Sequence, residues 1–231
     1  TLVYKLTNGL RLRLYTGQEA FNSQLLRYSG SEEFVNAFQS TCNIDLSKVS
    51  GSDDRLLFEC AGLQFIPYCL RETANILERA KEKLPNIIQP TDIKGIIHSH
   101  SDWSDGSSTV EAMAKRAIEK GFEYLVISDH SKTAFYAKGL NEERLREQQH
   151  YIDELNSKLA PFKIFKSIES DILNDGNLDY SNEVLATFDL VIASVHSNLK
   201  MTEEKAMMRL IKAIENPYTT ILGHMTGRLL L

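Results

Sequence analysis

A short apolar run that ends in a histidine or a glutamate recurs along residues 93–224, and this recurrence limits the possible folds more than any other feature. The runs end at His98, His130, Glu169, His196 and His224. Near-continuous apolar runs separated by helical segments are typical of parallel strands that are buried on both faces. Because the carboxyl ends of parallel strands meet at one edge of a sheet, we expect these side chains to converge. The pattern predicts an α/β fold with a functional site at that edge.

The first run carries the densest set of candidate ligands. His98 and His100 are two residues apart, a spacing that places both side chains on one side of a strand, and Asp105 follows after a short polar loop. An amphipathic helix is predicted next, over residues 109–120. Mixed imidazole and carboxylate ligands suit Zn²⁺, Mn²⁺ or Fe²⁺ better than Mg²⁺ or Ca²⁺. The sixth histidine, His150, falls in a predicted helix over residues 142–159, and we interpret it as a surface residue.

Six ordered motifs carry a resemblance to a known family. They are His98-Ser99-His100, Ser104-Asp105-Gly106, Ser128-Asp129-His130, Ile168-Glu169, Ser194-Val195-His196 and Gly223-His224-Met225-Thr226-Gly227-Arg228. Through these motifs, residues 93–230 resemble the polymerase and histidinol phosphatase (PHP) domain. The resemblance implies a distorted (β/α)7 barrel that holds up to three divalent metal ions at the carboxyl ends of its strands. It also implies that the metal ions are used to hydrolyse phosphoesters.

The resemblance further implies a set of seven metal ligands. They are His98, His100, Asp105, His130, Glu169, His196 and His224. One ion would take His98, His100 and Glu169, a second Glu169, His196 and His224, and a third Asp105 and His130. Glu169 would therefore bridge two ions, and such a cluster lowers the pKa of a bound water and delivers hydroxide to phosphorus. Arg228 is a candidate catalytic residue that could bind a phosphate oxygen, although an ion pair at the barrel rim is an equal alternative. For the carboxylates Asp129 and Asp171, we expect a role in orienting ligand imidazoles.

Residues 1–90 resemble a different family. The sequence predicts a β-hairpin over residues 2–14 with a two-residue turn at Asn8-Gly9, followed by short helices over residues 19–27, 31–38 and 72–84. With Arg27-Tyr28-Ser29-Gly30-Ser31 in place of Tyr-Phe-Thr-Gly-Ser, this segment resembles the end of the palm and the thumb of a family X DNA polymerase. We therefore expect a small α+β polymerase-like segment over residues 1–90 and a phosphoesterase domain over residues 91–231. Arg13 falls where that family has its third catalytic aspartate, so we do not expect nucleotidyl transfer. Arg11 and Arg13 are candidate DNA-phosphate contacts.

Composition sets further limits on partners and location. The net charge is −5, and the excess of acidic residues lies entirely after residue 90, which argues against broad electrostatic attraction to nucleic acid. Bound divalent metal would reverse the sign locally. The sequence has no apolar run of the roughly 20 residues that a bilayer-spanning helix needs, and no signal-peptide pattern, so we expect a cytoplasmic protein. The three cysteines lack pair spacing and are expected to be reduced and mostly buried.

The strand count predicts an incomplete barrel. We find five strands between residue 91 and residue 231, whereas the resemblance implies seven. The family's last motif, an Asp-x-His that supplies ligands to two of the ions, has no counterpart in this sequence. We therefore expect a fragment of a longer polymerase-like protein, with feeble hydrolysis and with an exposed strand edge that favours self-association.

Three functional hypotheses follow. The first is a metal-dependent 3′–5′ exonuclease that acts on DNA 3′ ends in repair, which is what the polymerase-like segment implies. The second is a phosphatase for a small phosphomonoester, similar to histidinol phosphatase, which would need a deep and closed pocket. The third is a non-catalytic module that binds DNA or organises a larger protein. The complete set of ligands before residue 231 argues against the third hypothesis.

Overall fold

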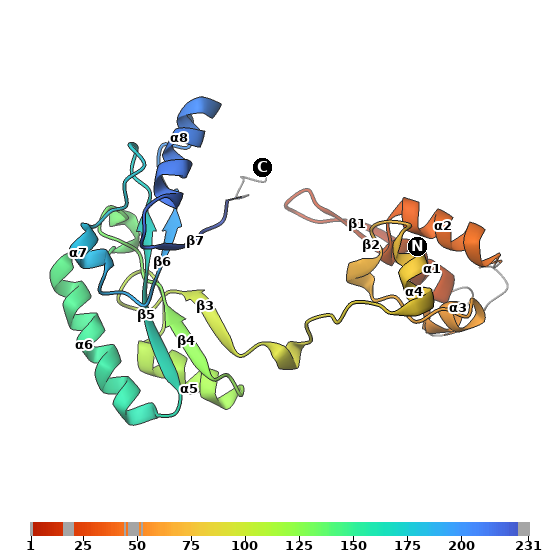
Figure 1. Cartoon of the computed structure of the whole chain (residues 1–231), viewed down its shortest axis with the longest axis horizontal. Helices are drawn as coiled ribbons and strands as arrows, with labels where there is room; N and C mark the ends of the chain where they lie inside the picture. Colours follow the sequence, from red (N-terminus) through yellow and green to blue (C-terminus); the bar gives the residue numbers. More distant parts are fainter. Residues whose placement is uncertain (1, 16–20, 44, 46–50, 52, 226–231) are drawn as a thin grey trace. The chain divides into compact units, whose positions relative to one another are not determined.

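The computed structural model describes residues 2–15, 21–43, 45, 51 and 53–225 (Figure 1). The backbone forms two compact units, residues 1–87 and residues 88–231. Among the described residues, no helix combines the length and the apolar character that crossing a membrane requires.

Within the described residues, the first unit contains a hairpin and four α-helices. Its elements are β1 (Leu2–Lys5), β2 (Arg11–Leu14), α1 (Phe21–Ser29), α2 (Glu32–Cys42), α3 (Arg55–Cys60) and α4 (Ile76–Glu82). The helices surround a core rich in phenylalanine. Ser31 caps α2, because its Oγ accepts a hydrogen bond of 3.0 Å from the amide of Phe34. The predicted helix over residues 72–84 is shorter in the structure, where α4 begins at Ile76.

The hairpin differs from its prediction at the turn. Lys5 pairs with Arg11, and the amide of Leu6 donates to the carbonyl of Leu10 at 2.8 Å, so three residues form the loop instead of two. Gly9 lies at φ +87°, a left-handed conformation that glycine adopts without strain. Both strands of the hairpin are exposed, including the candidate DNA contacts Arg11 and Arg13.

The buried charge of the first unit has a structural role. Arg71 is fully buried and donates to Asp54 at 2.5 Å and to the carbonyl of Ile66 at 2.8 Å, with its guanidinium over the ring of Phe58. An ion pair that is buried in this way is satisfied by specific partners and is costly to break. The cysteine prediction is partly wrong: the described cysteines are free thiols, but Cys60 and Cys69 are exposed.

The second unit is a parallel α/β structure. Its strands are β3 (Gly95–Ser99), β4 (Tyr124–Ile127), β5 (Lys163–Asp171), β6 (Leu190–Ser194) and β7 (Thr219–Leu222). Its helices are α5 (Val110–Glu119), α6 (Glu142–Leu159), α7 (Asn182–Leu185) and α8 (Glu203–Ile214). Each strand pairs in parallel with the next one along the chain, in the order β3-β4-β5-β6-β7 (Figure 1). A barrel is built in the same way, and the five strands are consistent with part of a PHP barrel; the seven-stranded barrel stays a prediction.

The core of the second unit explains why the apolar runs form its strands. Leu125, Ile127 and Ile164 of the sheet belong to one buried cluster with Val110 and Ala114 of α5. Thr109 caps that helix, because its hydroxyl accepts from the amide of Ala112 at 3.2 Å. The sheet is therefore anchored by its helices, and its carboxyl ends are free to carry polar side chains.

Candidate metal centre

Glu169 is the centre of the cluster that the strands bring together. Its side chain is buried, and the imidazoles of His98, His100 and His130 approach it from β3 and from the end of β4. His98 Nε2 lies 3.1 Å from Glu169 Oε1, and His100 Nε2 lies 3.4 Å from Oε2. His130 Nδ1 lies 3.3 Å from Oε2. Three separate positions of the sequence thus meet at one carboxylate.

Two more histidines reach the same carboxylate from the strands on the other side of β5 in the sheet order. His196 follows β6, and its Nε2 lies 3.2 Å from Glu169 Oε1. His224 follows β7, and its Nε2 lies 2.9 Å from Glu169 Oε1 and 3.3 Å from His196 Nε2. The convergence of all five strand-end histidines on Glu169 agrees with the expectation from parallel strands.

The first histidine pair is positioned by a backbone irregularity that the spacing did not predict. The pairing of β3 with β4 shifts register between Ile96 and Ser99, and His98 lies at φ +66° in the left-handed region. A plain strand would have placed His98 and His100 on one side by alternation alone. In the structure the irregularity turns the backbone at His98, and both rings still reach Glu169.

Asp105 lies at the more exposed end of the cluster. Its carboxylate oxygens are 3.8 Å from His100 Nδ1 and 3.7 Å from His130 Nε2. The loop that carries it closes on itself, since the amide of Gly106 donates to the carbonyl of Ser101 at 2.9 Å. A Cβ atom at Gly106 would lie 2.3 Å from the carbonyl oxygen of His100, so the tight loop requires glycine at this position.

Asp129 holds this loop against the sheet. Its buried carboxylate accepts hydrogen bonds from the amide and hydroxyl of Ser101, from Ser104 Oγ and from Gln148 Nε2, at distances between 2.5 and 2.7 Å. Asp129 therefore orients the loop that carries Asp105, and among the described contacts it touches no ligand imidazole. The expectation that it orients an imidazole directly is not met.

Asp171 contacts a ligand imidazole directly. Its Oδ1 lies 2.5 Å from His196 Nδ1, and its Oδ2 accepts from Thr133 Oγ1 at 2.8 Å. An imidazole that donates from Nδ1 to a carboxylate presents the lone pair of Nε2 on the other side, which is the arrangement that orients metal-binding histidines. His196 Nε2 accordingly faces Glu169.

In the absence of metal, the pKa values of the clustered side chains are shifted in different directions. Hydrogen bonds that the imidazole donates to Asp171 and then to Glu169 raise the pKa of His196 to about 9. Burial lowers the pKa of His130, although Glu169 opposes that shift. Burial alone would raise the pKa of Glu169, but its interactions with His196 and His98 hold that pKa well below its usual range. Glu169 is therefore ionised, and the cluster holds a proton on His196 at neutral pH.

The donors fit divalent metal. Three groups bring their ligand atoms within 4.8 Å of one another: His98, His100 and Glu169; His100, Asp105 and His130; and His130, Glu169 and His196. The buried Nδ1 atoms of His100 and His130 have no hydrogen-bond partner among the described residues. Buried polar atoms are normally paired, and a metal ion would satisfy donors of this kind. The second group extends the set implied for the third ion, because His100 joins Asp105 and His130.

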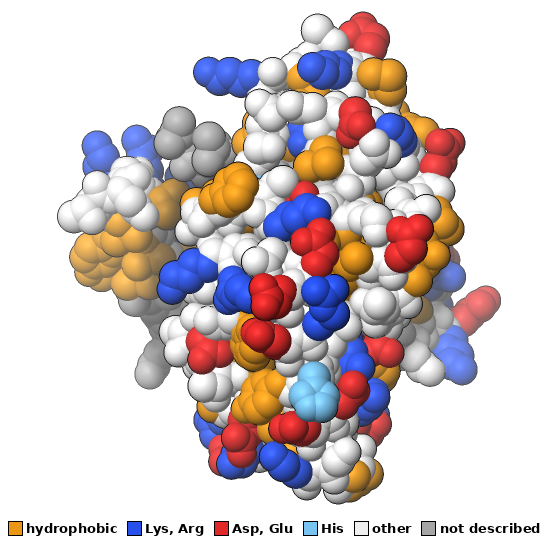
Figure 2. All heavy atoms as spheres, turned by 90° about the vertical axis from the view of Figure 1, so that its left-hand side faces the viewer, with side chains coloured by type: hydrophobic (Ala, Val, Ile, Leu, Met, Phe, Trp, Pro, Cys, Tyr) orange, Lys and Arg blue, Asp and Glu red, His pale blue; other side chains and the backbone are white. Residues whose placement is uncertain are grey.

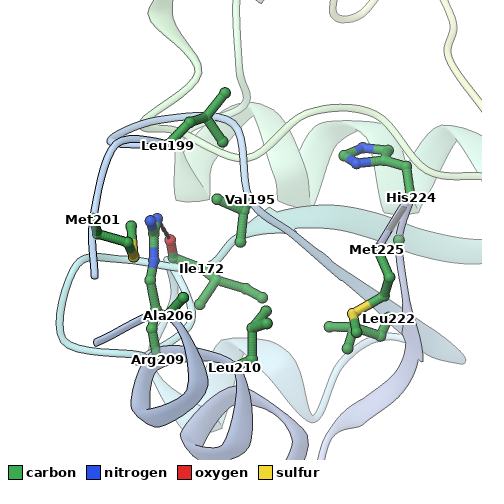
Figure 3. Close-up of a pocket in the computed structure, with 11 residues that line it drawn as sticks. Ile172, Val195, Leu199, Met201, Ala206, Arg209, Leu210, Leu222, His224 and Met225 are labelled. Carbon is green, nitrogen blue, oxygen red and sulfur yellow. Dashed lines mark hydrogen bonds between the residues drawn. The ribbon is translucent and has the colours of Figure 1, made fainter. Parts of the chain in front are cut away.

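A cavity opens beside His224. It has a volume of about 380 Å³ and apolar walls from Ile172, Val195, Leu210 and Leu222, all labelled in Figure 3. Arg209 also lines it, but its guanidinium donates to the carbonyls of Ile172, Leu173 and Ser197. Among the described residues that line the cavity, the only guanidinium is therefore occupied, and this lining suits an apolar group better than a phosphate.

The structure does not assign the remaining sequence-predicted residues to the described cluster. Arg228 lies outside the described residues, and Arg11 and Arg13 belong to the first unit. His150 is exposed on α6 and lies 3.4 Å from Glu154, as its interpretation as a surface residue requires. Sequence reasoning missed Tyr136, whose ring centroid lies 6.3 Å from that of His130. A single exposed aromatic residue in a loop gives no periodic signal.

Comparison with known families identifies the second unit. Residues 97–227 match the PHP domain. The chain belongs to the PHP domain family. Proteins with this domain depend on metal, and the His, Glu and Asp groups of this PHP domain could hold it. The predicted family is confirmed. The domain is of the metal-dependent phosphoesterase kind.

Individual relatives carry different names. The chain is 42% identical over 177 residues to the "DNA polymerase/3′-5′ exonuclease PolX" of Bacillus subtilis (strain 168), a match that covers 77% of the chain and 31% of the relative. It is 30% identical over 135 residues to a "probable phosphatase" of Caldanaerobacter subterraneus subsp. tengcongensis, covering 55% of the chain and 50% of the relative. A "probable phosphatase" of Thermoanaerobacter sp. (strain X514) is also 30% identical, with 51% of its length covered. The chain thus spans between 31% and 51% of the length of these relatives.

Proposed function

We propose that the PHP domain is a metal-dependent phosphodiesterase that removes nucleotides from DNA 3′ ends. The observation that carries the proposal is the convergence of five imidazoles on the buried carboxylate of Glu169. Hydrolysis at a 3′ end is favoured over other phosphoester chemistry by the 42% identity over 177 residues to a protein whose name includes 3′–5′ exonuclease.

Each side chain of the cluster has a distinct task in this proposal. The metal ions, when bound, supply a hydroxide nucleophile and offset charge on the leaving oxygen. Glu169 lies between the two histidine sets and would bridge two ions, while Asp171 fixes the imidazole of His196 through its Nδ1. Asp105, with His100 and His130, would hold an ion at the more exposed end. Arg228 is proposed to bind a phosphate oxygen.

The metals proposed are Mn²⁺, Zn²⁺ or Fe²⁺, at up to three positions. The cluster supplies more imidazole nitrogens than carboxylates, and such mixed donor sets suit these ions better than Mg²⁺ or Ca²⁺.

DNA is the proposed partner. Because the net charge of the chain is −5, basic side chains or bound metal at the contact would have to attract the DNA phosphates. On the face shown in Figure 2, basic and acidic side chains are interspersed. The exposed Arg11 and Arg13 of the hairpin are the proposed phosphate contacts of the polymerase-like segment. Action on DNA in repair would place the protein in the cytoplasm.

A second candidate is a phosphatase for small phosphomonoesters. Two observations favour it: relatives named probable phosphatases, and the apolar cavity of about 380 Å³ beside His224, which could hold the organic part of such a substrate. The third hypothesis, a non-catalytic module, is disfavoured by the presence of all seven implied ligands in one cluster.

The test combines metal content with substrate choice. The purified chain is analysed for bound metal and is then given Mn²⁺ with a 3′-labelled oligonucleotide or with a small phosphomonoester. Shortening of the oligonucleotide that is lost in Glu169→Ala and kept in His150→Ala supports the proposal. Faster hydrolysis of the monoester would favour the phosphatase, and equal activity of Glu169→Ala would refute both.

A further inference from the structure

A short turn beside the metal centre presents two aromatic rings to solvent. Between β4 and α6, the 3-10 turn Phe135–Ala137 carries Phe135, which is 84% exposed, and Tyr136, which is 72% exposed. Large aromatic side chains are usually the main contributors to a core. Two adjacent rings that are left in water next to a polar cluster are therefore a feature to explain.

The turn is held firmly, so the exposure of its rings is a built feature of the fold. Its small residues Ala134 and Ala137 are buried, as is Leu140 at its end. The amide of Leu140 donates to the carbonyl of His130 at 2.9 Å, and its carbonyl accepts from the hydroxyl of Tyr180. The aliphatic side chains thus anchor the turn and leave the aromatic ones outside.

Of the two rings, Tyr136 is the one beside the ligands. Its centroid lies 6.3 Å from that of His130, at an interplanar angle of 58°. Partial burial raises the pKa of its hydroxyl, and the charges of Asp171 and Glu169 raise it further. The ring is therefore neutral across the usual pH range. Among the described residues, Phe135 makes no ring contact with a ligand histidine.

We propose that the ring of Tyr136 is a stacking platform for the nucleobase, or an equivalent flat ring, next to the phosphate that the Glu169 cluster binds. This inference rests on the proposed function, because it assigns a place to the rest of the substrate. A phosphate on the cluster carries its sugar and base outward, over the exposed rim on which Tyr136 stands. Every base has a π-face, so stacking on a neutral ring selects nucleotides without selecting a sequence. A compact phosphomonoester would gain nothing from it.

The experiment compares two oligonucleotides that differ only in the base of the 3′-terminal nucleotide, which is present in one and missing in the other. We expect the wild-type chain with Mn²⁺ to prefer the base-bearing end in kcat/KM by at least about fivefold, the lower end of base–aromatic stacking. Tyr136→Leu should lose this preference, whereas Tyr136→Phe, which keeps the ring, should retain it. Phe135→Leu is the matched control, since it removes an equally exposed ring from the same turn.

A binding readout separates this inference from the proposed function. With 2-aminopurine as the terminal base, a non-hydrolysable terminal linkage and Zn²⁺ as the metal, stacking should quench fluorescence on wild-type protein, Tyr136→Phe and Phe135→Leu, but not on Tyr136→Leu. If no phosphoester is hydrolysed by the wild-type chain, the proposed function fails, and the quenching pattern alone decides the platform. Equal quenching by Tyr136→Leu and wild type, or an unchanged base preference in Tyr136→Leu, overturns the platform even if the chain is an active exonuclease.

Discussion

Replacing Asp171 by asparagine should weaken metal binding without removing a ligand. In the structure Asp171 Oδ1 lies 2.5 Å from His196 Nδ1, on the side of the ring opposite to the Nε2 that faces Glu169. The substitution removes the negative charge that makes His196 a more basic ligand and permits an amide to face Nδ1 instead. Loss of such a partner typically costs 10- to 100-fold in metal affinity, which corresponds to about 1.4 to 2.7 kcal/mol. The Asp171 side chain is only 5% exposed, so solvent offers little compensation.

The matched control for this prediction is Asp179→Asn. Asp179 accepts from the amide of Thr133 at 2.7 Å and from its hydroxyl at 2.9 Å, so it shares a partner with Asp171. Among the described residues, its side chain contacts no ligand imidazole. Both variants remove one buried charge from the same region, but only the first one acts on His196.

The assay is competition for Zn²⁺ against a chromophoric chelator, at equal protein concentration, with circular dichroism to verify the fold. We expect Asp171→Asn to bind metal at least about tenfold more weakly than wild type and Asp179→Asn to stay within about twofold. Affinities for Asp171→Asn that match wild type, or an equal loss in both variants, would show that the contact with His196 does not support the metal centre.

Three further predictions concern the cluster and the hairpin. Glu169→Ala should lose more bound metal by elemental analysis than His150→Ala, because it removes a carboxylate shared by two donor groups; equal metal content would contradict the assignment. The pKa of His196, raised from 6.5 to about 9, means that the stability it adds to the metal-free protein is complete below pH 6.5 and is lost as the pH rises through about 9. Urea unfolding in EDTA at pH 6.5 and 9.5 measures this loss as a fall in the free energy of unfolding. With metal bound, the fall should be absent. Arg11→Ala combined with Arg13→Ala should weaken DNA binding and make it less sensitive to salt in fluorescence anisotropy, and an unchanged salt slope would exclude the hairpin from the contact.

The parallel sheet and the gathering of candidate ligands could be predicted because both depend on local patterns. An apolar run of four to six residues predicts a buried strand, and a polar residue within three positions after it lies at the edge of the sheet where parallel strands end. His130, His196 and His224 follow this rule, and the structure brings them to Glu169. The N-caps Ser31 and Thr109 were predictable for the same reason, since each acts within three residues of itself.

Features that depend on contacts between distant segments could not be predicted. The register shift near His98 results from the pairing of β3 with β4. The alternation of side chains along β3 alone does not predict it. We expected Asp171 to orient a ligand imidazole, but no local pattern indicates that this imidazole belongs to His196, which lies 25 positions away. The exposure of Tyr136 depends on which residues of its turn are buried in the core, and in the structure these are Ala134 and Ala137. The three-residue hairpin loop likewise follows from the strand register, which Asn8-Gly9 alone does not determine.

The charge balance of the cluster connects its metal-free state to its proposed function. Glu169 is buried with its pKa held down, and in the absence of metal the proton that His196 keeps, with a pKa of about 9, compensates its charge. A divalent ion bound by His196 Nε2 must displace a proton from that imidazole, while Asp171 can retain the one on Nδ1. Metal uptake near neutral pH should therefore release a proton, and affinity should rise with pH until His196 is neutral. Proton and metal are in this sense alternative counter-ions of one buried carboxylate.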